Sequence, residues 1–270
     1  MLDAEEVERF VADGFVRLDD AIPRSLAEEC RALLWRDLER FGCARAEPAT
    51  WTWPVVRLPD RIDEPFRRAA NTPALHAAFD ALVGAGRWQP RGSLGFPVIR
   101  FPSEQDPGDT GWHVDASFAG RDSDPNDYLT WRVNVFSRGR ALLLLVLLSD
   151  VGPDDAPTRI LTGSHVDVAR LLAPAGEDGL TALELARRIE AGATTQREQA
   201  LAVGAAGTVY LCHPLLVHAA QRHRGREPRF LAQPPLLPAS PLALERTDAR
   251  YAPVERAIRE ALGLSARTSG

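Results

Sequence analysis

The second half of the sequence contains a series of short apolar or alternating segments, and these constrain the fold more than any other feature. The longest lies at residues 141–148, where every side chain is apolar. It is too short to span a membrane but has the length of a buried strand. Clusters of Gly, Pro, Asp and Ser separate it from similar segments at 94–101, 111–116, 129–136, 157–161, 207–212 and 229–232. This pattern predicts a sandwich or barrel of short strands.

Helical patterns surround these segments. Helices are predicted over residues 3–13, 23–41, 74–83, 179–192 and 253–262. The first three each end just before a glycine, the residue that most often follows a helix.

We therefore predict one α+β domain over residues 1–270 with a mainly β core. The core is expected to be a double-stranded β-helix, a cupin-like jelly roll, over about residues 94–236. A helical N-terminal part, about residues 1–90, would pack on its outside. The helix at about 179–192 would be an insertion, and the one at about 253–262 would close the chain.

The composition excludes several functions. A net charge of −5 gives no reason to expect a nucleic acid as partner. All 32 basic residues are arginine, which rules out lysine Schiff-base chemistry and a Walker A phosphate loop. Three widely spaced cysteines predict no disulfide framework. Without a recognisable leader or membrane segment, we expect a cytoplasmic protein with no membrane partner, whose oligomeric state stays open.

One tripeptide, His113-Val114-Asp115, carries the residue types of a metal site. Side chains two apart on a strand share a face, so both could point into a barrel from the predicted strand 111–116. A further histidine, His218, lies about a hundred residues later. Two imidazoles and one carboxylate form the facial triad that holds non-haem Fe(II) and leaves positions open. The same set could also hold zinc for non-redox chemistry.

Two other histidines compete for these roles. The tripeptide His165-Val166-Asp167 repeats the pattern, but it follows the turn-forming residues Thr162-Gly163-Ser164. We expect His165 to cap that turn or the helix after it. His213 precedes His218 by five residues, an odd number, so the two cannot share a face of a regular strand.

The sequence resembles the phytanoyl-CoA dioxygenase family of Fe(II)/2-oxoglutarate-dependent oxygenases, including its bacterial small-molecule branch. The resemblance rests on several short segments that occur in the same order as in the family. The matching segments are Asp13-Gly14-Phe15-Val16, His113-Val114-Asp115, Arg140-Ala141-Leu142, Ile160-Leu161-Thr162-Gly163-Ser164-His165, Gly207-Thr208-Val209 and His213-Pro214-Leu215-Leu216-Val217-His218.

The resemblance implies a role for individual residues. His113, Asp115 and His218 would bind Fe(II), and Arg229, eleven residues after His218, would anchor the distal carboxylate of 2-oxoglutarate. An arginine suits that task because its guanidinium is always charged and offers a fork of donors. Arg100 is a further candidate for contact with cosubstrate or substrate, or else a salt-bridging arginine.

The implied reaction is oxidation of an unidentified small molecule by O2, with 2-oxoglutarate converted to succinate and CO2. Because related halogenases carry a small residue in place of the carboxylate, Asp115 favours hydroxylation or desaturation over halogenation. The loop 120–128 and the inserted helix are expected to form a lid. A non-redox metal-dependent or non-catalytic jelly-roll protein that binds a small molecule remains the alternative.

Three positions depart from the family pattern. Ala220, two residues after His218, stands where a hydroxyl residue commonly helps to bind 2-oxoglutarate. Thr162 replaces the proline of the Pro-Gly-Ser-His turn, and Asp155-Ala156 replaces the usual Asn-Gly pair. The first departure leaves a second cosubstrate contact unassigned.

Overall fold

A seven-stranded antiparallel sheet forms the centre of the computed structural model, which describes residues 2–121, 124 and 127–264. Its strands, in spatial order, are β1 (Phe15–Leu18), β9 (Val209–Cys212), β5 (Leu142–Leu147), β11 (Arg229–Ala232), β3 (Pro97–Arg100) and β2 (Val55–Arg57), with β12 (Pro235–Leu236) also paired to β5. Each neighbouring pair is far apart in sequence, as expected when strands of a jelly roll alternate between two sheets.

A smaller sheet faces the inner side of the large one. It consists of β10 (His218–Ala219), β6 (Arg159–Leu161) and β8 (Gln199–Leu201), again antiparallel. A further two-stranded pair, β4 (Arg132–Val133) with β7 (Leu180–Thr181), lies near the helix inserted after it. Ile160 and Ala200 of the small sheet share one apolar core with β5, so the two sheets enclose a common interior.

Strand β5 explains why the apolar run at 141–148 lacks alternation. Leu143, Leu145 and Leu147 belong to the core between the two sheets, whereas Leu142 and Leu144 belong to the core beneath the helices. Because both faces of the strand are covered, every position is apolar. The predicted double-stranded β-helix with helices outside is confirmed.

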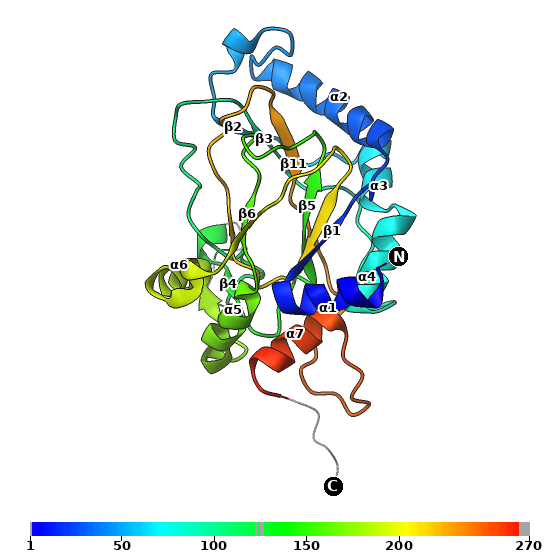
Figure 1. Cartoon of the computed structure of the whole chain (residues 1–270), viewed down its shortest axis with the longest axis vertical. Coiled ribbons are helices and arrows are strands. Elements are labelled where there is room, and N and C mark those ends of the chain that lie inside the picture. The colour runs from blue at the N-terminus through cyan, green and yellow to red at the C-terminus, as the bar shows by residue number, and fades with distance from the viewer. Residues whose placement is uncertain (1, 122–123, 125–126, 265–270) are drawn as a thin grey trace.

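Helices pack on the outside of the sheets; in Figure 1, α2 and α4 lie to the right of the large sheet, α1 crosses its lower end with α7 below it, and α5 and α6 lie at the lower left. They are α1 (Ala4–Asp13), α2 (Arg24–Arg40), α3 (Glu64–Ala70), α4 (Pro73–Val83), α5 (Ser164–Leu172), α6 (Ala182–Ala191) and α7 (Pro253–Ala261), with short 3-10 turns at Pro48–Thr50, Tyr128–Thr130, Ala173–Ala175 and Ala193–Gln196. The helices expected near 3–13, 23–41, 74–83 and 253–262 are present within two residues of those bounds, whereas α3 was not predicted and α5 was expected only as a helix of unstated length after the turn at 162–164.

Several expectations were wrong in detail. Residues 111–116 form no strand; only His113 pairs, in an isolated bridge with His218. Of 129–136 only β4 is a strand, preceded by a 3-10 turn. The helix expected from residue 179 begins at Ala182, because Thr181 and Glu184 form a capping box and the residues before it pair with β4. In the N-terminal part the brief strand that the sequence predicts at Phe15–Leu18 is present as β1, whereas β2 was not predicted; both strands join the large sheet.

The proposed lid falls partly outside the described residues, because 122–123 and 125–126 are not among them. In the part of the chain that is described, no helix combines the length and the apolar character needed to cross a membrane.

Candidate metal centre

Three side chains converge at the mouth of the interior. The donor atoms of His113, Asp115 and His218 all lie within 4.8 Å of one another, and they form the one such cluster among the described residues. The bridge between the two histidines creates this approach, since each backbone N–H donates to the other residue's carbonyl at 3.0 Å. Asp115 Oδ1 lies 3.7 Å from Nε2 of each histidine. The structure thus brings together the three residues that the sequence analysis predicts as metal ligands.

Backbone carbonyls fix the orientation of both rings. His113 Nδ1 lies 2.9 Å from the Gly111 carbonyl, and His218 Nδ1 lies 3.1 Å from the Leu216 carbonyl. A carbonyl can only accept, so each Nδ1 carries a hydrogen and Nε2 is the ring nitrogen that is left to bind a metal. This second contact is how proteins orient metal-binding histidines. Two imidazole Nε2 atoms and one carboxylate oxygen that lie close together fit a divalent non-haem iron.

The charges of the site agree with that use. Burial lowers the pKa of His113, with a further contribution from His218, so its ring is neutral and able to bind a metal. Burial alone would raise the pKa of Asp115, but Arg140 and the two histidines hold it well below its usual range. The carboxylate is therefore ionised throughout the physiological pH range.

Two contacts of the triad were missed in the sequence. Arg140 Nη1 lies 3.3 Å from Asp115 Oδ2. The Gln233 amide nitrogen lies 3.0 Å from His218 Nε2 and 3.5 Å from Asp115 Oδ2. Gln233 could have been found by counting, because it follows Arg229 by four residues and even spacing keeps it on the same face of that strand.

Arg229 lies on the interior face of β11, two residues from the core residue Leu231. It is 2% exposed, and among the described residues no carboxylate lies within ion-pair distance of its guanidinium. Its Nη1 donates to the Ala156 carbonyl, whereas Nε has no hydrogen-bond partner. Burial, together with the neighbouring Arg100, lowers the pKa of Arg229 to about 9. A buried cation without a counter-ion is costly, which indicates an anionic ligand.

Arg100 sits directly opposite Arg229, in register on β3. It is buried, as Arg229 is, but it donates to Asp109 Oδ2 at 2.6 Å. Arg57 pairs with the same carboxylate oxygen from the neighbouring strand. Arg100 therefore makes an ion pair, in the interior rather than at the surface, and its contact with cosubstrate or substrate stays a prediction. Three arginines and one aspartate leave this end of the barrel strongly cationic.

The competing histidines lie elsewhere. His165 is fully buried in the first turn of α5, with Nε2 3.0 Å from the Val11 carbonyl. His213 is equally buried, and its ring lies between the Val254 carbonyl and the Leu215 amide. The two rings pack against each other with centroids 4.8 Å apart. Gly14 must be glycine here, because it has a φ of +83° and an added Cβ would lie 2.4 Å from His165 Nδ1.

Ala220, which departs from the family pattern, has no hydroxyl, but its backbone carbonyl accepts hydrogen bonds from a neighbouring arginine. Arg159 donates to it from Nε and Nη2 at 3.2 and 3.0 Å, and also donates to the Thr110 carbonyl at 2.6 Å. The guanidinium carbon lies 4.6 Å from the centroid of the Trp112 ring. Arg159 thus ties the segment before His113 to the segment after His218.

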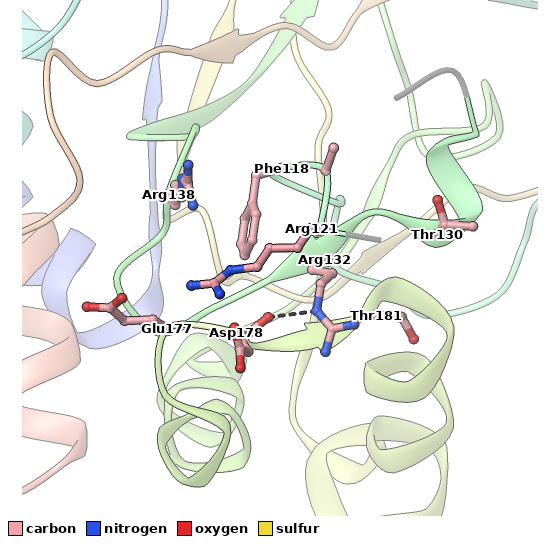
Figure 2. A pocket seen from close by; sticks show the side chains of 10 residues that line it. Phe118, Arg121, Thr130, Arg132, Arg138, Glu177, Asp178 and Thr181 are labelled. Carbon is pink, nitrogen blue, oxygen red and sulfur yellow. Dashed lines mark hydrogen bonds between the residues drawn. The ribbon is translucent and has the colours of Figure 1, made fainter. Parts of the chain in front are cut away.

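A pocket of about 640 Å³ is lined in part by residues that neighbour the metal centre in the sequence. It shares two chain segments with the metal centre, because Phe118 follows Asp115 by three residues and Arg138 precedes Arg140 by two. Figure 2 shows its side chains, with Arg132 bound to the backbone of Asp178. The lining residues are Phe118, Ala119, Gly120, Arg121, Thr130, Arg132, Arg138, Glu177, Asp178 and Thr181.

A jelly roll with two histidines and an aspartate at its mouth defines a metal-dependent enzyme of the non-haem oxygenase type. Residues 10–231 match the phytanoyl-CoA dioxygenase family, and this chain belongs to that family. Its class is that of the 2-oxoglutarate-dependent non-haem iron enzymes.

Solved structures agree with the fold. The epimerase SnoN of nogalamycin biosynthesis, in complex with Fe3+, alpha-ketoglutarate and nogalamycin RO, is 19% identical, with a TM-score of 0.59 over 86% of this chain and 81% of its own. HygX from Streptomyces hygroscopicus, with nickel, 2-oxoglutarate and hygromycin B bound, is 20% identical, with a TM-score of 0.52 over 93% and 95%. AviO1 from Streptomyces viridochromogenes Tue57 is 18% identical, with a TM-score of 0.52 over 90% and 99%. No curated protein sequence matches the chain.

Proposed function

We propose that this protein is an Fe(II)- and 2-oxoglutarate-dependent dioxygenase that hydroxylates, or otherwise oxidises, a small molecule and releases succinate and CO2. In this proposal His113, Asp115 and His218 hold the iron, and Arg229 holds the distal carboxylate of 2-oxoglutarate. The observation that carries it is the guanidinium of Arg229, which is buried on the interior face of β11 and has no carboxylate partner among the described residues.

The spacing along β11 supports this assignment. Gln233, whose amide contacts His218, lies on the same face as Arg229, about 13 Å further along an extended chain. An arginine side chain and a five-carbon dicarboxylate together span a gap of that order. A ligand that chelates the metal at one end can therefore place its other carboxylate at Arg229.

Each part of the site then has a task. Iron, when bound together with 2-oxoglutarate and O2, supplies the oxidising chemistry. The histidines and Asp115 hold it, and their backbone contacts keep the rings fixed. The leucines between the sheets exclude water from the interior. Because Asp115 supplies a carboxylate to the metal, hydroxylation or desaturation is favoured over halogenation.

The pocket in Figure 2 is the proposed entrance for the substrate, since it shares segments with the triad. SnoN and HygX were crystallised with nogalamycin RO and hygromycin B, respectively. By analogy, we propose that this chain also takes a small molecule; its identity stays open.

The test is anaerobic titration of the metal-free protein with Fe(II) and then 2-oxoglutarate. We expect a visible metal-to-ligand charge-transfer band. Pyruvate is the matched probe, because it has the same metal-chelating end but no distal carboxylate. The intact protein should bind 2-oxoglutarate at least about a hundredfold more tightly than pyruvate, as expected for a buried charge pair.

The Arg229→Met variant should bind both ligands with similar, weak affinity, whereas Arg138→Gln, in the pocket but outside the triad, should keep the preference. No band in the intact protein would contradict the proposal and favour a zinc-dependent or non-catalytic role. A band with unchanged preference in Arg229→Met would mean that another residue anchors the cosubstrate. Succinate release in the presence of metabolite mixtures would then identify the substrate.

A further inference from the structure

The two carboxylate oxygens of Asp115 have different surroundings. Oδ1 faces Nε2 of His113 and of His218, at 3.7 Å from each. Oδ2 faces away from them, toward Arg140 Nη1 at 3.3 Å and the Gln233 amide nitrogen at 3.5 Å. One oxygen is therefore directed toward the metal position, and the other forms an ion pair with Arg140 and accepts a long hydrogen bond from Gln233.

The turn that carries Arg140 is built to approach Asp115. Gly139 has a φ of +90°, and an added Cβ would lie 2.4 Å from the Ser117 carbonyl, so the turn and the segment after Asp115 are in direct contact. The Ser137 hydroxyl closes the turn by donating to the Arg140 carbonyl at 2.6 Å. Arg140 Nη2 donates to the Ala116 carbonyl at 3.0 Å, which fixes the guanidinium beside the carboxylate.

Arg140 is also nearly removed from solvent. Its side chain is 12% exposed, and neither its Nε nor its Nη1 has a hydrogen-bond partner among the described residues, so its link to Asp115 is an ion pair alone. Among the described residues, the polar contacts of this side chain are the carboxylate of Asp115 and the backbone carbonyl of Ala116. Solvent contact does not account for the position of Arg140, because its side chain is largely buried. Its one ion-pair partner within the described part of the chain is Asp115, a residue of the metal site.

We propose that Arg140 is a positioning residue that holds Oδ2 of Asp115 away from the metal, so that Asp115 binds through Oδ1 alone. Gln233 supports the same oxygen more weakly. This inference rests on the proposed function, because it takes the triad as the metal site. Single-oxygen binding keeps one more coordination position open for cosubstrate and O2. The positive charge of Arg140 also weakens the attraction of the carboxylate for a divalent cation.

The experiment uses the metal-free full-length protein and Co(II) alone, a spectroscopically visible substitute for Fe(II). Difference infrared spectra with and without Co(II) report the carboxylate, since the separation of its two stretching bands differs between one-oxygen and two-oxygen binding. Titration gives the dissociation constant. The variants are Arg140→Gln, which removes the charge, and Arg140→Lys, which keeps it without the fork of donors. Arg138→Gln, two residues away and outside the triad, is the matched control.

The intact protein and Arg138→Gln should show one-oxygen binding. Arg140→Gln should shift to the two-oxygen pattern and bind Co(II) about tenfold or more tightly. Arg140→Lys should regain the lower affinity but not the one-oxygen pattern. A purely structural arginine would leave the band separation unchanged, and an unchanged spectrum in Arg140→Gln would overturn the inference.

If Arg140→Gln fails to fold, Arg140→Lys decides by its band separation alone, and an intact-protein pattern there would also overturn it. The two proposals fail separately. An intact protein that binds no Co(II) contradicts the metal site itself. One that binds Co(II) and gives the charge-transfer band, while Arg140→Gln behaves as the intact protein does, contradicts only the role of Arg140.

Discussion

The tripeptide His-Val-Asp occurs twice in this chain, and the two copies have opposite fates. At 113–115 the histidine and aspartate side chains meet, and both face His218. At 165–167 they part: His165 is buried against α1, whereas Asp167 reaches the side chain of Arg197. Identical residues at identical spacing therefore give a metal site in one place and a structural contact in the other.

Backbone conformation explains the difference. In an extended chain, side chains two apart point to the same side. In α5 each residue turns by about 100°, so residues two apart point to nearly opposite sides. Residues 162–164 determine that the second copy is helical. Gly163 adopts a φ of +72° as the N-cap residue, and the helix begins at the next residue, Ser164. The pattern alone has no meaning until the local backbone is known.

Removing each aspartate in turn should show the largest difference between the two copies. Asp115→Ala should weaken Co(II) or Fe(II) binding by at least about a hundredfold, because even residues behind the ligands commonly cost tenfold to a hundredfold. Asp167→Ala is the matched control and should change the dissociation constant less than about twofold. Calorimetric titration of the metal-free proteins measures both. Equal losses in the two variants, or no loss in either, would mean that the copies have been assigned wrongly.

The general fold could be predicted because its signals are local. The apolar run at 141–148 and the helical periods near both ends specify strands and helices through their own neighbours. Short strands without such signals were missed. Strand β10 has two residues and exists only because Ile160 and Arg159 lie opposite it. Likewise α5 begins within a turn signal, and tertiary contacts extend it into a helix.

The site was predictable in part for a related reason. His113, Asp115, His218 and Arg229 follow from motif order, and the structure gathers the first three and places Arg229 on the interior face of β11. Their roles as ligands and anchor stay predictions until a titration tests them. Asp109 and Arg140 could not be found, because each acts through a partner that only the folded chain brings near.

The histidine of the second copy should reveal itself through stability rather than metal binding. Burial lowers the pKa of His165 to about 4, so the folded state keeps it neutral while an unfolded chain would protonate it near 6.5. Its contribution is therefore fully present above about pH 6.5 and is lost as the pH falls toward 4. Between about pH 7.5 and about pH 5 the loss should be about 2 kcal/mol.

Urea unfolding of the intact protein and of His165→Gln, at both pH values, isolates this effect, since other titrating groups cancel in the difference. Glutamine does not titrate and can still donate to the Val11 carbonyl. His165→Gln should lose less stability than the intact protein on acidification, by about 2 kcal/mol. Parallel losses would show that His165 is protonated in the folded state. Metal affinity should be unchanged in this variant.

The smallest expected effect concerns the aspartate of the second copy. Arg197 binds Asp167 through two hydrogen bonds, at 2.7 and 2.8 Å, with the two side chains 32% and 24% exposed. Partly exposed ion pairs contribute little, so Arg197→Gln should lower the free energy of unfolding by less than about 1 kcal/mol. The loss should shrink further in high salt, because solvent ions screen the pair. A loss of several kcal/mol that does not depend on salt would mean that the pair holds α5 in place. In that case both tripeptides would be essential to the protein. The first would be needed to bind the metal and the second to hold α5 in place.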